Sequence, residues 1–205
     1  MSHISVPSWA GDVSHETLNR FVQYVQLLLK WNATINLVGK TTEQDIWLRH
    51  IWDSYQLVPL VPRETSTIVD LGCGAGLPGI ILAIANPQWH VTLVERDQRK
   101  CSFLREATRS LGLSNTTIYQ KDAATLQQPF DLVTSRALAS LDVLLGFASR
   151  LMGKGASCLF PKGENFAKEI DEAHAHWAFT HRVIHSKTNE KAGIISVTEL
   201  KSVQR

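Results

Sequence analysis

The chain has 205 residues, of which 44% are hydrophobic and 20% are charged, and its formal net charge is +2. These values exclude a disordered or fibrous protein, and so small a net charge does not by itself require a nucleic-acid or membrane partner. The length favours one domain with a terminal extension over two full catalytic domains.

Three cysteines occur at wide spacing, Cys73, Cys101 and Cys158. An odd number without a CxxC pair argues against a zinc site or a redox dithiol, so we expect reduced thiols and no metal.

No apolar run approaches the roughly 20 residues that a membrane helix needs. The N-terminus also lacks the basic start and apolar stretch of a secretory signal, and we therefore expect a cytoplasmic protein without membrane contact.

Two helical patterns come first along the chain. Apolar residues recur at helical spacing over residues 15–31, with Ser14 as the N-cap, and the first helix therefore has an apolar stripe that needs a partner. A second helical pattern over residues 43–58 ends before Pro59 and supplies that partner. We predict a helical N-terminal extension over residues 1–64, packed on a core domain over residues 65–205.

From Thr67 onward, short β-branched runs alternate with longer helical ones, which is typical of a mostly parallel sheet with crossover helices. The predicted strands are residues 67–70, 91–94, 116–119, 130–133 and 157–160. The predicted helices are residues 78–86, 97–111, 140–151 and 164–176. Two further runs, 180–185 and 194–200, predict an antiparallel hairpin that closes the sheet. The predicted fold class is therefore α/β and Rossmann-like, with a seven-stranded sheet.

The first predicted strand ends in Asp70 and leads into a glycine-rich segment with Gly72, Gly74 and Gly76 at alternate positions. Glycines permit a sharp turn and let the backbone approach a ligand, although a purely structural turn is the alternative. Dinucleotide sites prefer GxGxxG, whereas the third glycine here comes one residue early, which argues against a nicotinamide-dependent oxidoreductase. The spacing resembles the loop of Rossmann-like (class I) methyltransferases, and it predicts S-adenosyl-L-methionine as the cofactor, bound by these glycines with Asp70 close by.

Acidic residues follow the next two predicted strands. Glu95 ends the second strand a little over 20 residues beyond the loop, where a carboxylate can accept hydrogen bonds from both ribose hydroxyls; a solvated carboxylate is the alternative. Asp122 follows the third strand, where this fold brings a loop against the adenine ring. It either accepts the adenine amino group or caps a short helix.

Several local motifs together resemble one family, and their order and spacing run through most of the chain. They are Lys30-Trp31-Asn32, Ile35-Asn36-Leu37, Arg49-His50-Ile51 with Asp53-Ser54, Gly72-x-Gly74-x-Gly76-Leu77-Pro78-Gly79, and Ser135-Arg136-Ala137. The chain looks like a member of the ribosomal RNA small subunit methyltransferase G family, formerly called glucose-inhibited division protein B. Its members methylate N7 of a guanine in the 530 loop of 16S ribosomal RNA, at position 527 as the family is named.

Carried over by position, the resemblance implies cofactor contacts at Gly72, Leu77, Ala123, Ala124 and Arg136. It also implies 16S ribosomal RNA as the partner, within the small ribosomal subunit or an assembly intermediate. We expect a monomer. The alternatives are a methyltransferase for another RNA site or a small molecule, and a non-catalytic assembly factor that has kept the fold.

Guanine N7 carries a lone pair and no proton, so methyl transfer to it needs positioning rather than a general base. Arg136 is the candidate for this positioning role, because it follows the fourth strand at the edge where ligands bind; a surface ion pair with Glu164 is the alternative. Lys162 either touches RNA phosphate or lies in solvent.

On the second predicted helix, an intrahelical pair accounts for Arg49 and Asp53, which stand four residues apart. His50 lies on the apolar side of that helix and is interpreted as a core histidine whose ring nitrogens are hydrogen-bonded.

Overall fold

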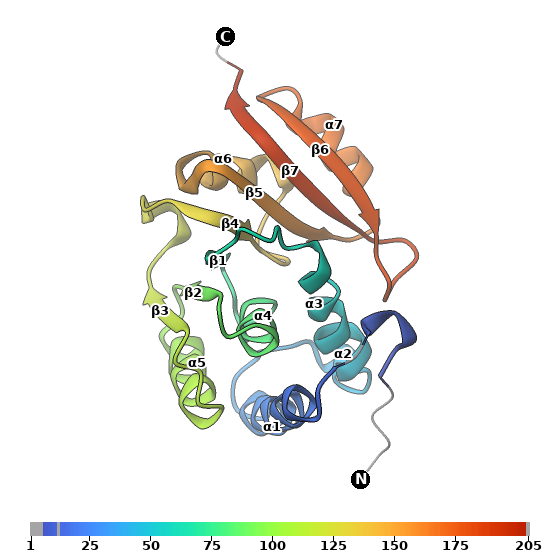
Figure 1. The fold of residues 1–205 in the computed structure, drawn as a ribbon, viewed down its shortest axis with the longest axis vertical. Coiled ribbons are helices and arrows are strands. Elements are labelled where there is room, and N and C mark those ends of the chain that lie inside the picture. The colour runs from blue at the N-terminus through green and yellow to red at the C-terminus, as the bar shows by residue number, and fades with distance from the viewer. Residues whose placement is uncertain (1–5, 12, 204–205) are drawn as a thin grey trace.

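A seven-stranded sheet runs through the molecule, as the computed structural model of residues 6–11 and 13–203 shows (Figure 1). Its strands lie in the order β3-β2-β1-β4-β5-β7-β6. The strands are β1 (Thr67–Leu71), β2 (His90–Glu95), β3 (Thr116–Gln120), β4 (Phe130–Thr134), β5 (Met152–Lys162), β6 (Trp177–His185) and β7 (Gly193–Ser202). The first five pair in parallel, and β7 pairs antiparallel with both β5 and β6. The predicted fold class is confirmed.

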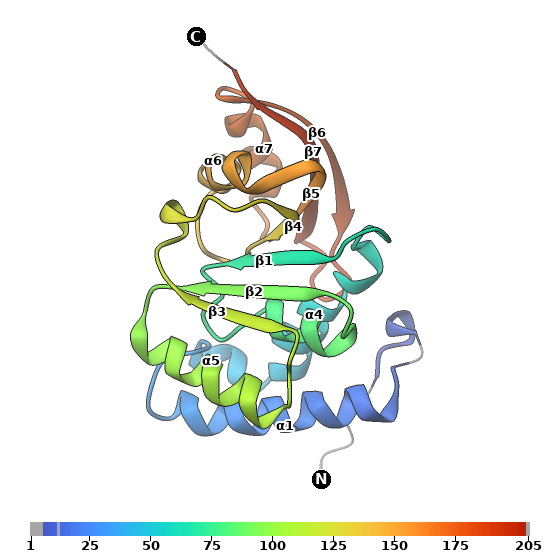
Figure 2. The ribbon, with the colours of Figure 1, turned by 60° about the vertical axis from the view of Figure 1, so that its left-hand side comes forward.

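Helices cover both faces of this sheet (Figure 2). Successive side chains of a strand point to opposite faces, so Ile68 packs with one hydrophobic cluster and Val69 with the other. The first cluster contains residues of α1 (His15–Asn32), α4 (Gly79–Ala85) and α5 (Gln98–Ser110), and the second contains residues of α6 (Leu141–Leu151) and α7 (Phe166–Ala173). Because both faces are covered, the β1 residues from Ile68 onward are all buried.

The N-terminal segment is helical but broken into short pieces. The predicted N-cap of α1 is confirmed, because Thr17 N donates a 3.1 Å hydrogen bond to Ser14 Oγ. The single helix predicted over residues 43–58 is not observed. The structure instead has α2 (Lys40–Glu43), the π-helical turn η2 (Trp47–Trp52), α3 (Asp53–Tyr55) and the 3-10 turn η3 (Val58–Leu60), and a further 3-10 turn, η1 (Ser8–Ala10), precedes α1. His50 lies within the π turn, and Asp53 follows it directly as the first residue of α3.

Several predicted boundaries differ from the observed ones, always at element ends. The strand predicted at residues 157–160 extends over the whole of β5, and both strands of the hairpin are longer than predicted, because hydrogen bonding between neighbouring strands continues through polar residues. The helix predicted at residues 164–176 ends at Ala173. A short 3-10 turn, η4 (Ala123–Thr125), follows β3. The division at residues 64 and 65 stays a prediction.

A separate observation concerns membranes. Within the ranges 6–11 and 13–203, no helix is both long enough and apolar enough to span a bilayer.

Candidate cofactor and substrate cleft

The turn after β1 depends on its three alternate glycines. Gly72, Gly74 and Gly76 have φ values of 61°, 57° and 83°, in the left-handed region that favours glycine. A Cβ at Gly72 would lie 2.5 Å from Cδ1 of Leu138, and one at Gly76 would lie 2.5 Å from Cδ1 of Ile80. A Cβ at Gly74 would meet only the Gly72 carbonyl oxygen, at 4.0 Å, so this part of the turn leaves space beside the backbone.

Asp70 is fully buried and joins the end of β1 to the start of α4. Its Oδ2 accepts a 2.8 Å hydrogen bond from Gly79 N, while its Oδ1 has no hydrogen-bond partner among the described residues. Burial raises the pKa of Asp70 to about 7, although the Gly79 hydrogen bond and the charge of Arg136 act in the opposite direction. A Cβ at Gly79 would lie 2.9 Å from Asp70 Oδ2, so the approach between the two residues requires glycine there.

Glu95 supports the glycine turn from β2. The residue is 7% exposed, its Oε2 accepts a 3.0 Å hydrogen bond from Gly74 N, and its Oε1 accepts a 2.8 Å hydrogen bond from Asp97 N. The alternative of a solvated carboxylate is therefore wrong. The ribose role stays a prediction.

The predicted adenine-side residues lie at the end of β3. Asp122 Oδ1 accepts a 2.9 Å hydrogen bond from Ala124 N, which makes Asp122 the cap of η4, one of its two expected roles. Its Oδ2 lies 3.7 Å from exposed Arg96, a distance that contributes little to stability. Ala123 is buried and Ala124 is exposed. This edge is next to Glu95, because Lys121 N donates to the Glu95 carbonyl oxygen at 3.1 Å.

A cleft of about 950 Å³ brings together segments that are far apart in the sequence. Of the predicted cofactor residues, Gly72, Gly74, Leu77 and Arg136 line it, whereas Asp70, Gly76, Glu95, Asp122, Ala123 and Ala124 do not. The other walls come from the N-terminal segment, the turn after β5 and the loop between β6 and β7, and they include Thr42, Arg49, His50, Asp53, Lys162, Thr188 and Asn189.

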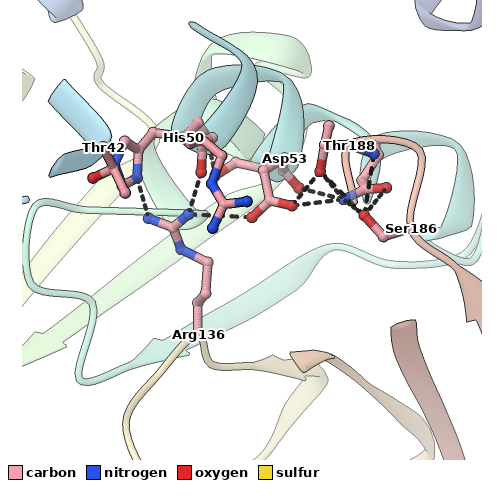
Figure 3. Close-up of polar contacts among 9 residues, drawn as sticks. Thr42, His50, Asp53, Arg136, Ser186 and Thr188 are labelled. Carbon is pink, nitrogen blue, oxygen red and sulfur yellow. Dashed lines mark hydrogen bonds and ion pairs between the residues drawn. The ribbon is translucent and has the colours of Figure 1, made fainter. Parts of the chain in front are cut away.

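Arg136 points across this cleft to the N-terminal segment (Figure 3). Its NH1 donates to Asp53 Oδ2 and to the Arg49 carbonyl oxygen, both at 3.2 Å, and its NH2 lies 3.1 Å from His50 Nδ1. The alternative of a surface ion pair with Glu164 is wrong, since the carboxylate that pairs with Arg136 belongs to Asp53. The expected pair between Arg49 and Asp53 is also wrong, because Asp53 Oδ2 lies 3.2 Å from Arg136 NH1 instead.

His50 is buried and its two ring nitrogens have different partners. Nδ1 faces the Arg136 guanidinium, which can only donate, so Nδ1 accepts and Nε2 carries the proton toward Thr42 Oγ1 at 2.8 Å. Burial and the charge of Arg136 lower the pKa of His50 to about 4, so the imidazole is neutral near pH 7. The interpretation as a hydrogen-bonded buried histidine is confirmed.

The loop between β6 and β7 reaches the same network. Asp53 Oδ1 accepts a 2.7 Å hydrogen bond from Thr188 Oγ1 and a 2.9 Å hydrogen bond from Gln56 Nε2 (Figure 3). Gln56 Oε1 accepts from Lys187 N at 2.7 Å. Sequence reasoning missed Gln56 and Thr188, because more than 130 residues separate the partners and no local pattern links them.

Lys162 forms an internal ion pair instead of facing solvent. Its side chain is 8% exposed, and Nζ lies 2.7 Å from Glu169 Oε2 and donates to the Ala139 carbonyl oxygen at 2.6 Å. Glu169 in turn accepts a 2.6 Å hydrogen bond from Leu141 N. The pair therefore fixes the loop that follows Arg136, and the expectation of a solvated turn lysine is wrong.

Tyr24 of α1 also holds the glycine turn, which the sequence reasoning did not predict. Its hydroxyl donates to the Ala75 carbonyl oxygen at 2.6 Å, and burial raises the pKa of this hydroxyl well above its ordinary value. Tyr24 lies beside Phe21 and Val25 on the apolar stripe of α1, and this position could have predicted a hydrogen bond, because a buried hydroxyl needs a partner.

Comparison with known proteins agrees with the motifs. A family model described as rRNA small subunit methyltransferase G matches residues 17–200. The chain is 47% identical over 193 residues to the ribosomal RNA small subunit methyltransferase G of Gluconobacter oxydans, and the match covers 93% of this chain and 98% of that protein.

Solved structures of other methyltransferases share the fold. The ribosomal protein L11 methylase of Lactobacillus delbrueckii subsp. bulgaricus matches with a TM-score of 0.59 at 15% identity, over 78% of this chain and 80% of that one. The magnesium protoporphyrin IX methyltransferase of Synechocystis PCC 6803, solved with bound SAM, matches with a TM-score of 0.57 at 16% identity, over 91% of this chain and 98% of that one. At these identities the likeness concerns the fold alone.

Proposed function

The chain belongs to the rRNA small subunit methyltransferase G family, and we propose that it transfers a methyl group from S-adenosyl-L-methionine to N7 of a guanine in the 530 loop of 16S ribosomal RNA. The observation that carries the proposal is that the glycine turn after β1 and Arg136 line one cleft. We propose a monomeric cytoplasmic enzyme that acts on the small ribosomal subunit or an assembly intermediate. We also propose the two-part organisation, with a helical extension over residues 1–64 and a core over residues 65–205.

The residues around the glycine turn fit the proposed cofactor. The turn leaves open space at Gly74, and the buried carboxylate of Glu95 lies within 3.0 Å of the Gly74 amide, close enough to accept hydrogen bonds from a ribose beside the turn. We assign the cofactor to this turn and to the edge beyond β3. The assigned residues are Gly72, Gly74, Leu77, Glu95, Ala123, Ala124 and Arg136, with Asp70, Gly76 and Asp122 adjoining them.

Methyl transfer to guanine N7 requires mainly that the protein positions the cofactor and the base. When bound, the sulfonium cofactor would supply an electrophilic methyl group to the lone pair of guanine N7, which carries no proton, and the S–CH3 bond would break to leave neutral S-adenosylhomocysteine. The protein holds the two groups in line at near-attack distance, and no general base is needed. Arg136 either fixes the carboxylate of the cofactor or donates to guanine O6, since a guanidinium suits both acceptors.

Transfer of a labelled methyl group tests the proposal. Small ribosomal subunits that lack the modification are expected to accept label, whereas subunits that already carry it are not. Equal labelling of both particles would point to another RNA site. No labelling of either particle would contradict the proposed function.

A further inference from the structure

Asp53 is the point at which three distant segments meet in the cleft. Its Oδ2 pairs with Arg136, which follows β4, and its Oδ1 accepts from Thr188 in the loop between β6 and β7. Asp53 itself belongs to the N-terminal segment, and its side chain is only 21% exposed. The two oxygens of one carboxylate therefore fix the separation between Arg136 and this loop.

The loop between β6 and β7 is compact and is hydrogen-bonded to the N-terminal segment. It closes on itself through 3.0 Å hydrogen bonds from Ser186 N to the Ala192 carbonyl oxygen and from Ala192 N to the Asn189 carbonyl oxygen, so it is a compact unit. Its shortest links to the N-terminal segment are 2.7 Å hydrogen bonds from Thr188 Oγ1 to Asp53 and from Lys187 N to Gln56, and longer hydrogen bonds join the Gln56 side chain to Ser186 and Thr188. These links set the position of the loop, whose residues Thr188 and Asn189 line the cleft.

The location of this network separates it from the proposed cofactor residues. Apart from Arg136, those residues follow β1, β2 and β3, which form one half of the sheet. Arg136 follows β4, next to both halves of the cleft, and the loop belongs to the hairpin beyond β5. The half of the cleft beyond β4 is thus left for the base that receives the methyl group. Small displacements matter there, since a misplacement of about 1 Å can cost a reaction roughly a hundredfold in rate.

We propose that Asp53 is a positioning residue for methyl transfer, which holds Arg136 with one carboxylate oxygen and Thr188 with the other so that both form the target-base side of the cleft. The inference rests on the proposed function. It assigns the loop between β6 and β7 to the substrate site, with guanine in RNA as the group that this wall positions.

Thr188→Val tests the inference, because it removes the hydroxyl that reaches Asp53 and leaves the pair of Asp53 with Arg136 intact. In methyl transfer to unmethylated small subunits, kcat is expected to fall at least fivefold, while the Kd for S-adenosylhomocysteine stays within twofold of wild type. Thr188→Ser keeps the hydroxyl and is expected to restore kcat to within twofold. If Thr188→Val acted only by changing packing, Thr188→Ser, which lacks the methyl group of Thr188, would not restore kcat.

A matched control lies in the same hairpin. Thr180 also donates its hydroxyl to a carboxylate, Glu199 Oε2 at 2.8 Å, but neither Thr180 nor Glu199 lines the cleft. Thr180→Val is therefore expected to leave kcat unchanged. Thr188→Val and Asp53→Asn both act on the Asp53 carboxylate, so their effects on kcat are not independent. When Asp53→Asn is already present, Thr188→Val is therefore expected to change kcat less than twofold.

The outcomes separate the two proposals. Wild-type kcat in Thr188→Val, an equal fall in Thr180→Val, or failure of Thr188→Ser to restore activity would overturn the role of Asp53. Independent, multiplicative losses from Thr188→Val and Asp53→Asn would do the same. A wild-type protein that labels no unmethylated subunit contradicts the proposed function itself, and the inference falls with it.

Discussion

Replacing Tyr24 with phenylalanine isolates one hydrogen bond between α1 and the glycine turn. The change deletes only the hydroxyl that donates to the Ala75 carbonyl oxygen at 2.6 Å, in a site where Tyr24 is fully buried and Ala75 is 4% exposed. A buried acceptor left without its donor costs roughly 1–3 kcal/mol. We expect the free energy of unfolding to fall by about 2 kcal/mol, which for a chain of this size lowers Tm by roughly 4–8 °C.

Urea unfolding and calorimetric titration with S-adenosylhomocysteine measure the two consequences. Binding is expected to weaken as well, because Ala75 lies between two glycines of the turn. Tyr55→Phe is the matched control, since Tyr55 packs against Phe21 nearby and its hydroxyl has no hydrogen-bond partner in the described part of the chain. If Tyr24→Phe unfolded and bound S-adenosylhomocysteine as the control does, the idea that α1 supports the turn would be refuted.

Three further predictions concern buried charges. Glu95→Gln removes a charged acceptor, so calorimetry is expected to find S-adenosylhomocysteine binding weakened roughly 10- to 100-fold; unchanged affinity would rule out the ribose role. Because the folded state raises the pKa of Asp70 from 3.8 to about 7, it keeps a proton that the unfolded chain has lost. Asp70 therefore stabilises less as pH rises through that range, and wild type should lose about 2 kcal/mol relative to Asp70→Asn between pH 5.5 and 8 in urea unfolding; parallel pH profiles would contradict this. Lys162→Met leaves the Glu169 carboxylate, which is 22% exposed, without its ion-pair partner and should lower the free energy of unfolding by about 3 kcal/mol. A fall below 1 kcal/mol would mean that solvation of the Glu169 carboxylate replaces the lost ion pair.

The sheet was predictable because its signals are local. Buried strands such as β1 and β2 are short runs rich in β-branched and aliphatic residues, and the change of period between strands and helices is visible within about ten residues. The glycine spacing was equally informative, since the positive φ at Gly72 favours that residue type. Errors at the ends of β5 arose because pairing with a neighbouring strand, rather than local sequence, sets where a strand stops.

The connections across the cleft were not predictable in the same way. The partners of Arg136 lie more than 80 residues away, and the π turn that precedes Asp53 has no sequence signal comparable with a cap or a glycine. Lys162 was misjudged for a related reason, because a lysine after a strand is ordinarily solvated and only the fold brings Glu169 to it. Sequence identified the residue types at the cleft, and tertiary structure decided their partners.

We propose that this chain methylates N7 of one guanine in 16S ribosomal RNA. Mass-spectrometric mapping of N7-methylguanine in 16S ribosomal RNA, from otherwise identical cells with and without the protein, tests it most directly. We expect one N7-methylguanine, in the 530 loop, to be present with the protein and absent without it. An unchanged map, or a loss at a different nucleotide, would contradict the claim.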